Sequence, residues 1–598
     1  MSQIFKARRV NVKKGKHSGN TALISTLRLF FMAVAIAALF ETGAAQTAKP
    51  ASPITFDQIV DEYFELYFRF HPSAGTLAGF HQYDSQLEDY SAKTRHAEIE
   101  ALRAFAPKLE QRLEATPSHD QSLDLEFLRS RVRGTLLELE TIRPWQKDPD
   151  PYASGPAYAL YLLIKRNYAP PEERLRSVIE REKQVPAALQ AARTNLQNPP
   201  RVFTEIALEQ LPGTISFVEH DIPLAFGSVK DEKLLADFRE STRNAVAALR
   251  SYENFLRKEL LPVSKGDFRL GAEAFRKKLQ YDELVEIPLS RLREIGYADL
   301  RRNQELLKKA AAQVDPSKST RDVLAQIRKD HPPANQLLQS FRDTLASLRT
   351  FIEQHKIVTI PSNLEPVVEE TPPFARALTT AAMDTPGPYE TKAPGGIFQV
   401  TLPDPKTSSE QVEKYLQGFS RSGLISTAIH EVYPGHFEQY LWTLKIHSKV
   451  RQLLYCGTNG EGFAHYTEQM MLDEGYSSDP KVRVGQLVDA LLRNSRYIAG
   501  LEMHTGNMTV EQAKSFFIKE GYQVAPIAEV EARRGTSDPL YMVYTLGKLQ
   551  ILKLREDYRK QQGDKFTLQD FHDRFLGYGG LQIKLIREAM LQNPGETL

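Results

Sequence analysis

Two histidines separated by six positions, His430 and His436, set the strongest condition on how this chain can fold. Histidines four positions apart on a helix lie about 40° from each other and can bind one metal ion, whereas six positions are about 240° of rotation and separate the two rings. Pro434 cannot donate to the carbonyl of residue 430, and Gly435 tolerates unusual backbone angles. We therefore expect a helical bulge at Pro434-Gly435 that returns the second histidine to the face of the first.

Two glutamates near these histidines complete a pattern that is typical of zinc hydrolases. Glu431 directly follows the first histidine, where such enzymes place the carboxylate that takes a proton from water at the metal. Glu461 begins a second predicted helix and is flanked by two glycines. Two imidazoles and one carboxylate are a common zinc donor set. The pattern therefore predicts one zinc ion per chain, held by His430, His436 and Glu461.

The third ligand has an alternative on the same helix face. Glu461, His465 and Glu468 recur at spacings of four and three positions, so their side chains project together. One of them can bind the metal while another orients a ligand from behind. We choose Glu461 as the ligand, because it lies nearest the helix start, and keep Glu468 as the second choice. The structural alternative is a polar stripe that neighbouring helices satisfy without a metal.

The rest of the chain is typical of a mainly helical protein with one short β-rich stretch. Helical periodicity begins at Phe56 and continues to about residue 360, with corners at Pro-containing breaks. Two β-type runs, residues 356–360 and 396–402, predict a small antiparallel sheet beside the metal helix. An extended substrate could pair with its edge, or the sheet could simply cover the helix. We expect residues 56–355 to form one wall of a cleft and residues 356–598 to hold the metal site.

Residues 1–45 have the features of an export signal, and residues 46–55 those of a linker. A basic start precedes an apolar core of about a dozen residues, which is shorter than the roughly 20 that span a bilayer. Without this segment the formal net charge changes from +2 to −4, because the segment carries seven of the 77 basic residues and one of the 75 acidic ones. We expect an exported protein, periplasmic or secreted, without a basic face for nucleic acid. An uncleaved signal that anchors the chain to the membrane is the alternative.

The two motifs together resemble the bacterial domain of unknown function 885, whose mark is H-E-x-x-P-G-H followed by E-G-W-A-x-Y-x-E. The chain carries the first motif at residues 430–436 and the second at residues 461–468, with Phe463 in place of Trp. An early pattern of the family, Pro, then Gly-x-His, then Asp, recurs as Pro72, Gly79-Phe80-His81 and Asp84. The family is similar to helical gluzincins such as the thimet oligopeptidase and carboxypeptidase Taq families. The resemblance implies a mainly α, clefted, zincin-like (gluzincin) peptidase fold.

Downstream residues resemble further parts of this family's pattern, and the resemblance implies roles for them at the metal. Arg493 and Arg496 match an Arg-x-x-Arg pattern, and an arginine there could hold a substrate carboxylate. His504 and Tyr544 match a later His and Tyr, which could donate to the oxyanion of a tetrahedral intermediate. The family's Pro-Gly-Gln before this tyrosine is replaced here by Ser-Asp-Pro-Leu, and Tyr541 follows as a second candidate.

Three functions agree with these observations. The first is an exported zinc metallopeptidase that cleaves short peptides in a cleft, with Glu431 as the general base. The second is a zinc amide hydrolase that acts on cell-wall peptides by the same chemistry. The third is a non-catalytic binding protein that the metal stabilises, although a purely structural zinc site is usually closed by four protein ligands and has no need of Glu431.

Overall fold

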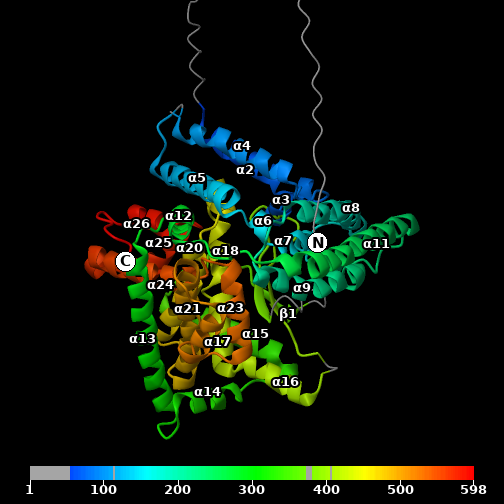
Figure 1. Ribbon diagram of the computed structural model, residues 1–598. Coiled ribbons are helices and arrows are strands. Elements are labelled where there is room, and N and C mark those ends of the chain that lie inside the picture. The colour runs from blue at the N-terminus through cyan, green and yellow to red at the C-terminus, as the bar shows by residue number, and fades with distance from the viewer. Residues whose placement is uncertain (1–53, 112, 114, 372–379, 405–406) are drawn as a thin grey trace, which may run out of the picture. The chain divides into compact units, whose positions relative to one another are not determined.

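Helices make up most of the chain, which confirms the prediction of a mainly helical protein. The structure is a computed structural model that describes residues 54–598 except 112, 114, 372–379 and 405–406 (Figure 1). The predicted signal of residues 1–45, and the predicted linker up to residue 53, lie outside the described residues. Residues Thr55–Leu598 form one compact unit. None of the described helices is both long and apolar enough to cross a bilayer.

The helices of the first predicted region begin at residue 56, as expected. Thr55 caps the first of them: its side chain accepts a hydrogen bond from the backbone of Gln58, whose side chain accepts one in return. The α-helices of this region are α2 (Phe56–Phe70), α3 (Pro72–Ala78), α4 (Ala92–Phe105), α5 (His119–Leu137), α6 (Pro144–Lys147), α7 (Pro151–Ile164), α8 (Pro171–Asn195), α9 (Arg201–Ser216), α10 (Ile222–Leu224), α11 (Glu232–Phe255), α12 (Ala272–Glu283), α13 (Leu289–Val314), α14 (Thr320–Arg328) and α15 (Leu337–His355).

Helical structure returns at Ser409 and continues almost to the end of the chain. The α-helices of this region are α16 (Ser409–Leu416), α17 (Arg421–Glu431), α18 (His436–Thr443), α19 (Lys449–Leu453), α20 (Gly457–Asp473), α21 (Pro480–Thr505), α22 (Val510–Lys519), α23 (Ala525–Ser537), α24 (Val543–Gln562), α25 (Leu568–Gly577) and α26 (Ile583–Met590). Short 3-10 or π segments join several helices: η1 (His81–Tyr83), η2 (Ala106–Glu110), η3 (Glu138–Ile142), η4 (Phe217–Asp221), η5 (Leu256–Leu260), η6 (Leu261–Val263), η7 (Ala334–Gln336), η9 (Gln417–Phe419) and η10 (Gly563–Lys565).

The small sheet is mixed, so the prediction of an antiparallel sheet is correct for only one of its two strand pairs. The strands β1 (Val367–Glu370), β2 (Ala381–Asp384) and β3 (Ile397–Val400) lie in the order β1-β3-β2. β2 pairs antiparallel with β3, whereas β1 pairs parallel with β3. The chain can bring β1 and β3 into the same direction because the long connection between them includes β2.

The strand predicted at residues 356–360 does not form. Helix α15 ends at His355, and Lys356 adopts a left-handed conformation with φ of 50°. Ile357 and Val358 are buried outside any strand, and the Ile357 carbonyl accepts a hydrogen bond from His572. The run of β-branched residues therefore reflects burial against α25 and not strand pairing.

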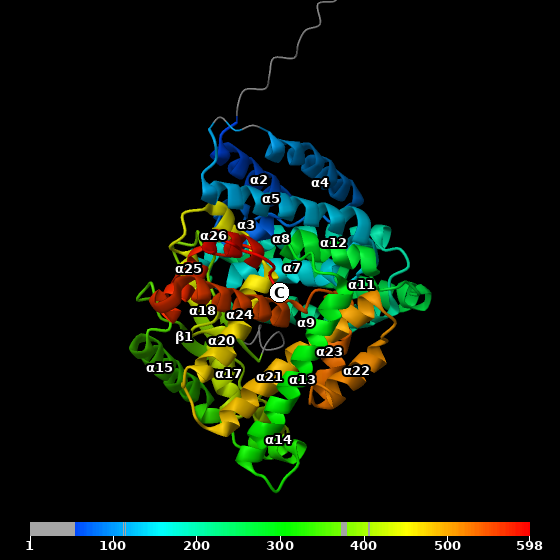
Figure 2. The ribbon, with the colours of Figure 1, turned by 90° about the vertical axis from the view of Figure 1, so that its left-hand side faces the viewer.

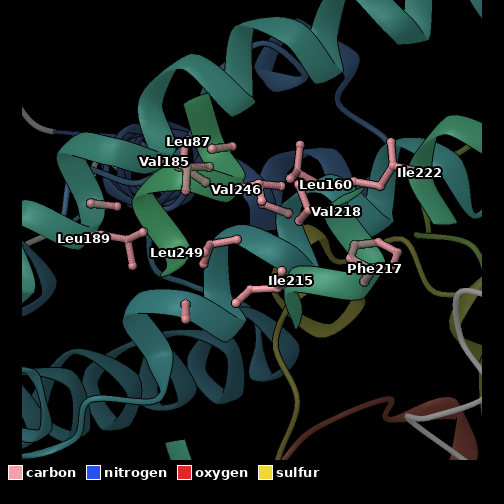
Figure 3. Close-up of a cluster of buried hydrophobic side chains, with 14 of the residues drawn as sticks. Leu87, Leu160, Val185, Leu189, Ile215, Phe217, Val218, Ile222, Val246 and Leu249 are labelled. Carbon is pink, nitrogen blue, oxygen red and sulfur yellow. The ribbon is translucent and has the colours of Figure 1, made fainter. Parts of the chain in front are cut away.

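Two groups of helices form the main apolar cores. Buried side chains from α7, α8, α9 and α11 meet in one core (Figure 3). A second core gathers side chains of α12, α13, α14, α21 and α24. The long helices α13 and α21 lie side by side, and Figure 2 shows α17 and α20 beside α21. Helices from both predicted regions thus contribute to the packing around α17 and α20.

Candidate metal centre

The first histidine motif spans two helices instead of one bulged helix. Helix α17 begins at a Ser420 cap, whose side chain accepts from the Gly423 N–H at 3.2 Å, and it ends at Glu431. Helix α18 then begins at His436. The predicted break is present, but the chain leaves the helix completely between residues 432 and 435, so the expected bulge within one helix is wrong. The reason is that Pro434 has no N–H with which to continue the helix.

A close approach of backbone to backbone explains why glycine stands before His436. A Cβ atom built on Gly435 would lie 1.8 Å from the His430 carbonyl oxygen and 2.4 Å from that of Ile429. Any side chain at this position would therefore push α18 away from the end of α17. The Tyr433–Pro434 peptide between the two helices is cis. This tight connection brings the second histidine back beside the first.

Three potential ligand atoms converge at the junction of α17, α18 and α20. Glu461 Oε2 lies 3.5 Å from His430 Nε2 and 3.5 Å from His436 Nε2. All three ligand atoms lie within 4.8 Å of one another. The side chain of His430 is only 8% exposed, whereas those of His436 and Glu461 are 24% and 27% exposed. The three residues chosen from the sequence therefore form one cluster that is open on one side.

Hydrogen bonds at the far side of each imidazole turn both Nε2 atoms toward the cluster. His430 Nδ1 lies 2.7 Å from Glu468 Oε1, and His436 Nδ1 lies 3.1 Å from Gln439 Oε1. Glu468 is fully buried and also contacts His465 Nδ1 at 3.2 Å and Arg493 at 3.1 Å. Glu468 thus orients the His430 ring from behind, and Glu461 is the carboxylate that faces the two Nε2 atoms.

The charges around these residues favour an ionised carboxylate in both positions. Burial tends to raise the pKa of Glu468, but Arg493 and His465 outweigh it and hold this pKa well below its ordinary value. Burial also tends to raise the pKa of Glu461, but its hydrogen bonds with His430 and His436 outweigh burial and hold this pKa well below its ordinary value. Burial lowers the pKa of His430, but hydrogen bonds with the two carboxylates raise it to about 9. The cluster therefore attracts positive charge, whether a proton or a metal ion.

Glu431 lies at the exit of α17, beside the two histidines. Its Oε2 accepts a hydrogen bond of 3.1 Å from the backbone N–H of Met383, in the middle of strand β2. No sequence pattern marks Met383, because it acts through a backbone N–H that every residue except proline carries. The sheet therefore holds the carboxylate that the sequence assigned as general base.

The start of α20 is held by a buried carboxylate from α12. Glu283 accepts hydrogen bonds from the Gly457 and Thr458 N–H groups at 3.2 and 2.9 Å and from the Thr458 hydroxyl at 2.6 Å. The buried Cys456 thiol donates to the same carboxylate at 2.7 Å. A carboxylate at a helix N-terminus satisfies free N–H groups and interacts favourably with the helix dipole. Glu283 therefore anchors the turn that leads to Glu461.

Helix α24 crosses α20 at two glycines, and this contact brings Tyr544 to the cluster. A Cβ on Gly547 would lie 1.9 Å from the Thr458 carbonyl, and one on Gly462 would lie 2.6 Å from the Gly547 Cα. The ring of Tyr544 lies 6.5 Å from that of His430 at 18°. Tyr544, one of the downstream candidates, therefore lies beside His430.

The two arginines of α21 have different surroundings. Arg493 contacts Glu468 and lies 3.4 Å from His430 Nδ1, on the side of His430 that faces away from Glu461. Arg496 makes two hydrogen bonds of 2.7 Å to the buried Glu531, and its guanidinium lies 5.0 Å from the Tyr544 ring centre. Arg496 therefore stacks on Tyr544 with its charge already paired.

The structure does not bring His504 or Tyr541 to the cluster. His504 Nε2 lies 2.7 Å from the Gly535 carbonyl, and its Nδ1 accepts from the Leu270 N–H at 3.4 Å. It is also three helical turns beyond Arg493 on α21, which is about 16 Å. The ring of Tyr541 is buried under Arg534, and within the described ranges its hydroxyl has no hydrogen-bond partner. Neither residue contacts the three ligand candidates, so the catalytic role expected of His504 has no support in this geometry.

Comparisons with known proteins agree with the early resemblance. A family described as "Bacterial protein of unknown function (DUF885)" matches residues 72–590. A solved structure from Shewanella oneidensis, described as a candidate lipoprotein of unknown function, is 27% identical with a TM-score of 0.76, over 90% of this chain and 100% of that chain. A candidate lipoprotein from Colwellia psychrerythraea is 18% identical with a TM-score of 0.76, over 89% of this chain and 97% of that chain, and shows a shared fold. Among curated proteins none matches.

Proposed function

Because the chain belongs to the DUF885 family of bacterial proteins, whose description assigns no function, we propose one from the geometry of its own site: a zinc-dependent hydrolase of peptide bonds. The observation that carries this proposal is the convergence of His430, His436 and Glu461 next to a second carboxylate, that of Glu431. A purely structural site has no use for an additional carboxylate at this position.

The donor set fits zinc in number, chemistry and orientation. Two imidazole nitrogens and one carboxylate oxygen are the ligands that catalytic zinc sites use, and such sites keep a further position open. Both Nδ1 atoms are engaged elsewhere, so only the Nε2 atoms are directed at the cluster. A zinc ion bound there would polarise the scissile carbonyl and make a water molecule more acidic.

Glu431 is the general base of the proposed reaction. One of its oxygens, Oε2, accepts from Met383, which leaves Oε1 to take the proton of the attacking water. The same carboxylate then gives the proton to the leaving amine, so it ends each cycle in its starting state. The hydrogen bond to a strand fixes the carboxylate in position before substrate arrives.

Tyr544 is the best-placed donor for the developing oxyanion. Burial and the neighbouring Glu461 raise the pKa of its phenol, so the hydroxyl keeps its proton at neutral pH. A protonated phenol beside the ligand cluster can donate a hydrogen bond where negative charge develops on the substrate. The arginine stacked on its ring, Arg496, restricts how Tyr544 can move.

The edge strand β2 beside Glu431 suits an extended peptide as the substrate. Strand β2 lies at an edge of its sheet and carries Met383 next to Glu431. An extended peptide can add to such an edge through main-chain hydrogen bonds, which hold any sequence in register. We propose short peptides as substrates and a zincin-like (gluzincin) fold. The candidate-lipoprotein descriptions of the two similar structures support an exported, envelope location.

Zinc content and hydrolysis test the proposal together. We expect about one zinc per chain in the mature protein and a large loss in His436→Ala, whereas the exposed His447→Ala serves as the control. Glu431→Gln should retain zinc and lose peptide hydrolysis, while the exposed Glu410→Gln should change neither. Zinc that persists in His436→Ala would remove the proposed site, and full hydrolysis in Glu431→Gln would remove the proposed base.

A substrate panel separates the two enzymatic alternatives. Linear oligopeptides and cell-wall peptide fragments would be offered to the same zinc-loaded protein, with Glu431→Gln as the blank. Preference for the linear peptides supports the peptidase. Preference for the cell-wall fragments would support the amide hydrolase that acts on them.

A further inference from the structure

The position of Glu431 depends on a very short strand. Its carboxylate accepts from Met383 in β2, a four-residue strand at the edge of the sheet. Among the residues that the structure describes, strand β2 pairs with β3 alone, so strand pairing supports it from one side. A short edge strand of this kind needs a second attachment if it is to hold a catalytic carboxylate in place.

Two basic residues from the helical region before residue 355 supply that attachment. Lys165 and Arg166 follow directly after α7 and contact Asp384, the last residue of β2. Lys165 Nζ lies 2.9 Å from Asp384 Oδ1, and Arg166 donates to Asp384 Oδ2 at 2.7 Å and to the Asp384 carbonyl at 2.9 Å. Arg166 also donates to the Gly395 carbonyl at 2.5 Å, on the other side of the β2–β3 connection.

These contacts are well shielded from water. The side chains of Lys165, Arg166 and Asp384 are 9%, 7% and 14% exposed. Charge-assisted hydrogen bonds in such surroundings are stronger than those at the surface, and their geometry is more restricted. Arg166 holds both the end of the strand and the chain that leads into β3. We call Lys165, Arg166 and Asp384 the β2 clamp.

A second group of contacts holds the β2–β3 connection. Gly79, with φ of 101°, packs so closely that a Cβ there would lie 2.3 Å from the Glu390 backbone nitrogen. His81 Nε2 lies 3.0 Å from Glu390 Oε2, and the Tyr389 N–H donates to the Ala78 carbonyl at 3.0 Å. The Gly-x-His pattern near residue 80 thus joins the segment after α3 to the β2–β3 connection. It makes no contact with the metal cluster.

We propose that Arg166 and Lys165 are positioning residues for Glu431. They fix Asp384, and through Asp384 they fix the Met383 N–H that donates a hydrogen bond to the Glu431 carboxylate. The inference rests on the proposed function for what Glu431 does, and it gives the helical region before residue 355 a part in the reaction. Neither basic residue touches the ligand cluster or the substrate edge at Met383, so each acts through the strand.

Amide hydrogen exchange tests the clamp without any assay of activity. In the full-length protein, Arg166→Gln should increase exchange in the β2 segment, and above all at the Met383 amide, by at least about tenfold, since local opening then requires fewer broken contacts. The exposed Arg176→Gln on α8 is the matched control. Arg166→Lys, which keeps the charge but not the forked contacts, should lie between the two. Unchanged exchange at Met383 in Arg166→Gln would overturn the inference.

Kinetics provide a second and independent readout. Arg166→Gln should lower kcat by about 10²-fold with zinc content and KM nearly unchanged, because small displacements of a catalytic group have effects of this size. Asp384→Asn keeps the side-chain volume and should give the same pattern if the arginine variant folds poorly. A loss of zinc parallel to the loss of activity in both variants would show a general structural role and would overturn the inference. If the wild-type protein hydrolyses no peptide, the proposed function fails, while the exchange experiment still decides the clamp.

Discussion

Glu461 and Glu468 carry the same functional group two turns apart on α20, yet their surroundings give them different chemistry. Glu461 faces His430 and His436 at equal distances of 3.5 Å and is partly exposed. Glu468 has no exposed surface and is enclosed by His430, His465 and Arg493. A ligand must reach the metal from an open side, whereas an orienting group works best when it is buried and fully hydrogen-bonded.

Replacing these two glutamates should therefore have unequal effects on zinc. Glu468→Gln keeps an acceptor for His430 but loses the charge that Arg493 neutralises, so we expect zinc affinity to fall about 10- to 100-fold. Glu461→Gln removes a proposed zinc ligand, so the zinc affinity of this variant should fall much further. Competition with a chromophoric chelator measures both affinities. The opposite order of the two variants would identify Glu468 as the ligand.

Glu182 is a buried acid on α8, the helix that contributes Val185 and Leu189 to the apolar core in Figure 3. Its carboxylate accepts from Ser241 and Thr242, but burial outweighs these donors and raises its pKa from 4.5 to about 7. The folded chain then binds more protons than the unfolded chain between pH 4.5 and 7. This group consequently lowers stability as the pH rises through that window, and the full cost is present above pH 7.

Glu182→Gln should remove this dependence. Because glutamine cannot ionise and keeps the acceptor for Ser241, the variant should match the wild type near pH 4.5 and exceed it by about 3 kcal/mol at pH 8. Urea unfolding at a series of pH values measures the difference. The exposed Glu180→Gln on the same helix is the control. A difference that stays constant from pH 5 to pH 8 would contradict the prediction.

Among the helices, the contact of α20 with α24 determines how the ligand cluster meets Tyr544. The two backbones touch at Gly462 and Gly547, which allows no side chain between them. A Cβ on Gly547 would approach the Thr458 carbonyl to 1.9 Å, and this carbonyl lies in the first turn of α20. The glycines therefore fix the distance between Tyr544 and Glu461.

Gly547→Ala should separate the two helices and so damage both stability and the site. We expect the free energy of unfolding to fall by about 1–3 kcal/mol, as for other overpacked cores, together with weaker zinc binding. Gly213→Ala in α9 is the matched control, since nothing lies within 4 Å of the added Cβ. At an exposed helix position, alanine in place of glycine should raise the free energy of unfolding by about 0.5–1 kcal/mol. Equal changes in the free energy of unfolding and in zinc binding for the two variants would contradict a close contact between α20 and α24.

The parts of the site that could be predicted from sequence are those that local spacing encodes. His430, Glu431 and His436 lie in one short motif, and Glu461 and Glu468 share a helix face, so their grouping follows from periodicity. The form of the break did not follow, because it depends on how closely Gly435 approaches the His430 carbonyl.

Features that depend on distant segments left no local pattern. The parallel pairing of β1 with β3 depends on the path of the intervening chain, and Met383 acts through its backbone. His504 matched a motif, but helix geometry places it three turns away from Arg493. A mainly helical chain with a small sheet was therefore predictable, and the neighbours of the sheet were not.

Across the folded unit, the candidate site joins elements that are remote in sequence. Helix α12 supplies the cap of α20, and the segment after α7 holds β2. Two further helices, α17 and α18, bring His430 and His436 to Glu461 of α20. A metal ion bound there would cross-link three helices, so its binding is coupled to the stability of the unit.

Zinc should consequently raise the melting temperature, but only slightly. At a zinc concentration 100 times the dissociation constant, binding adds about 2.7 kcal/mol, and because the unfolding entropy of so long a chain is large this corresponds to a rise of about 2 °C. Calorimetry before and after chelation measures it, with re-addition of zinc as the check of reversibility. His447→Ala should show the full rise and His436→Ala almost none. A rise of equal size in both variants would mean that zinc stabilises the chain from another position, and the cluster of His430, His436 and Glu461 would then lose its place as the metal site.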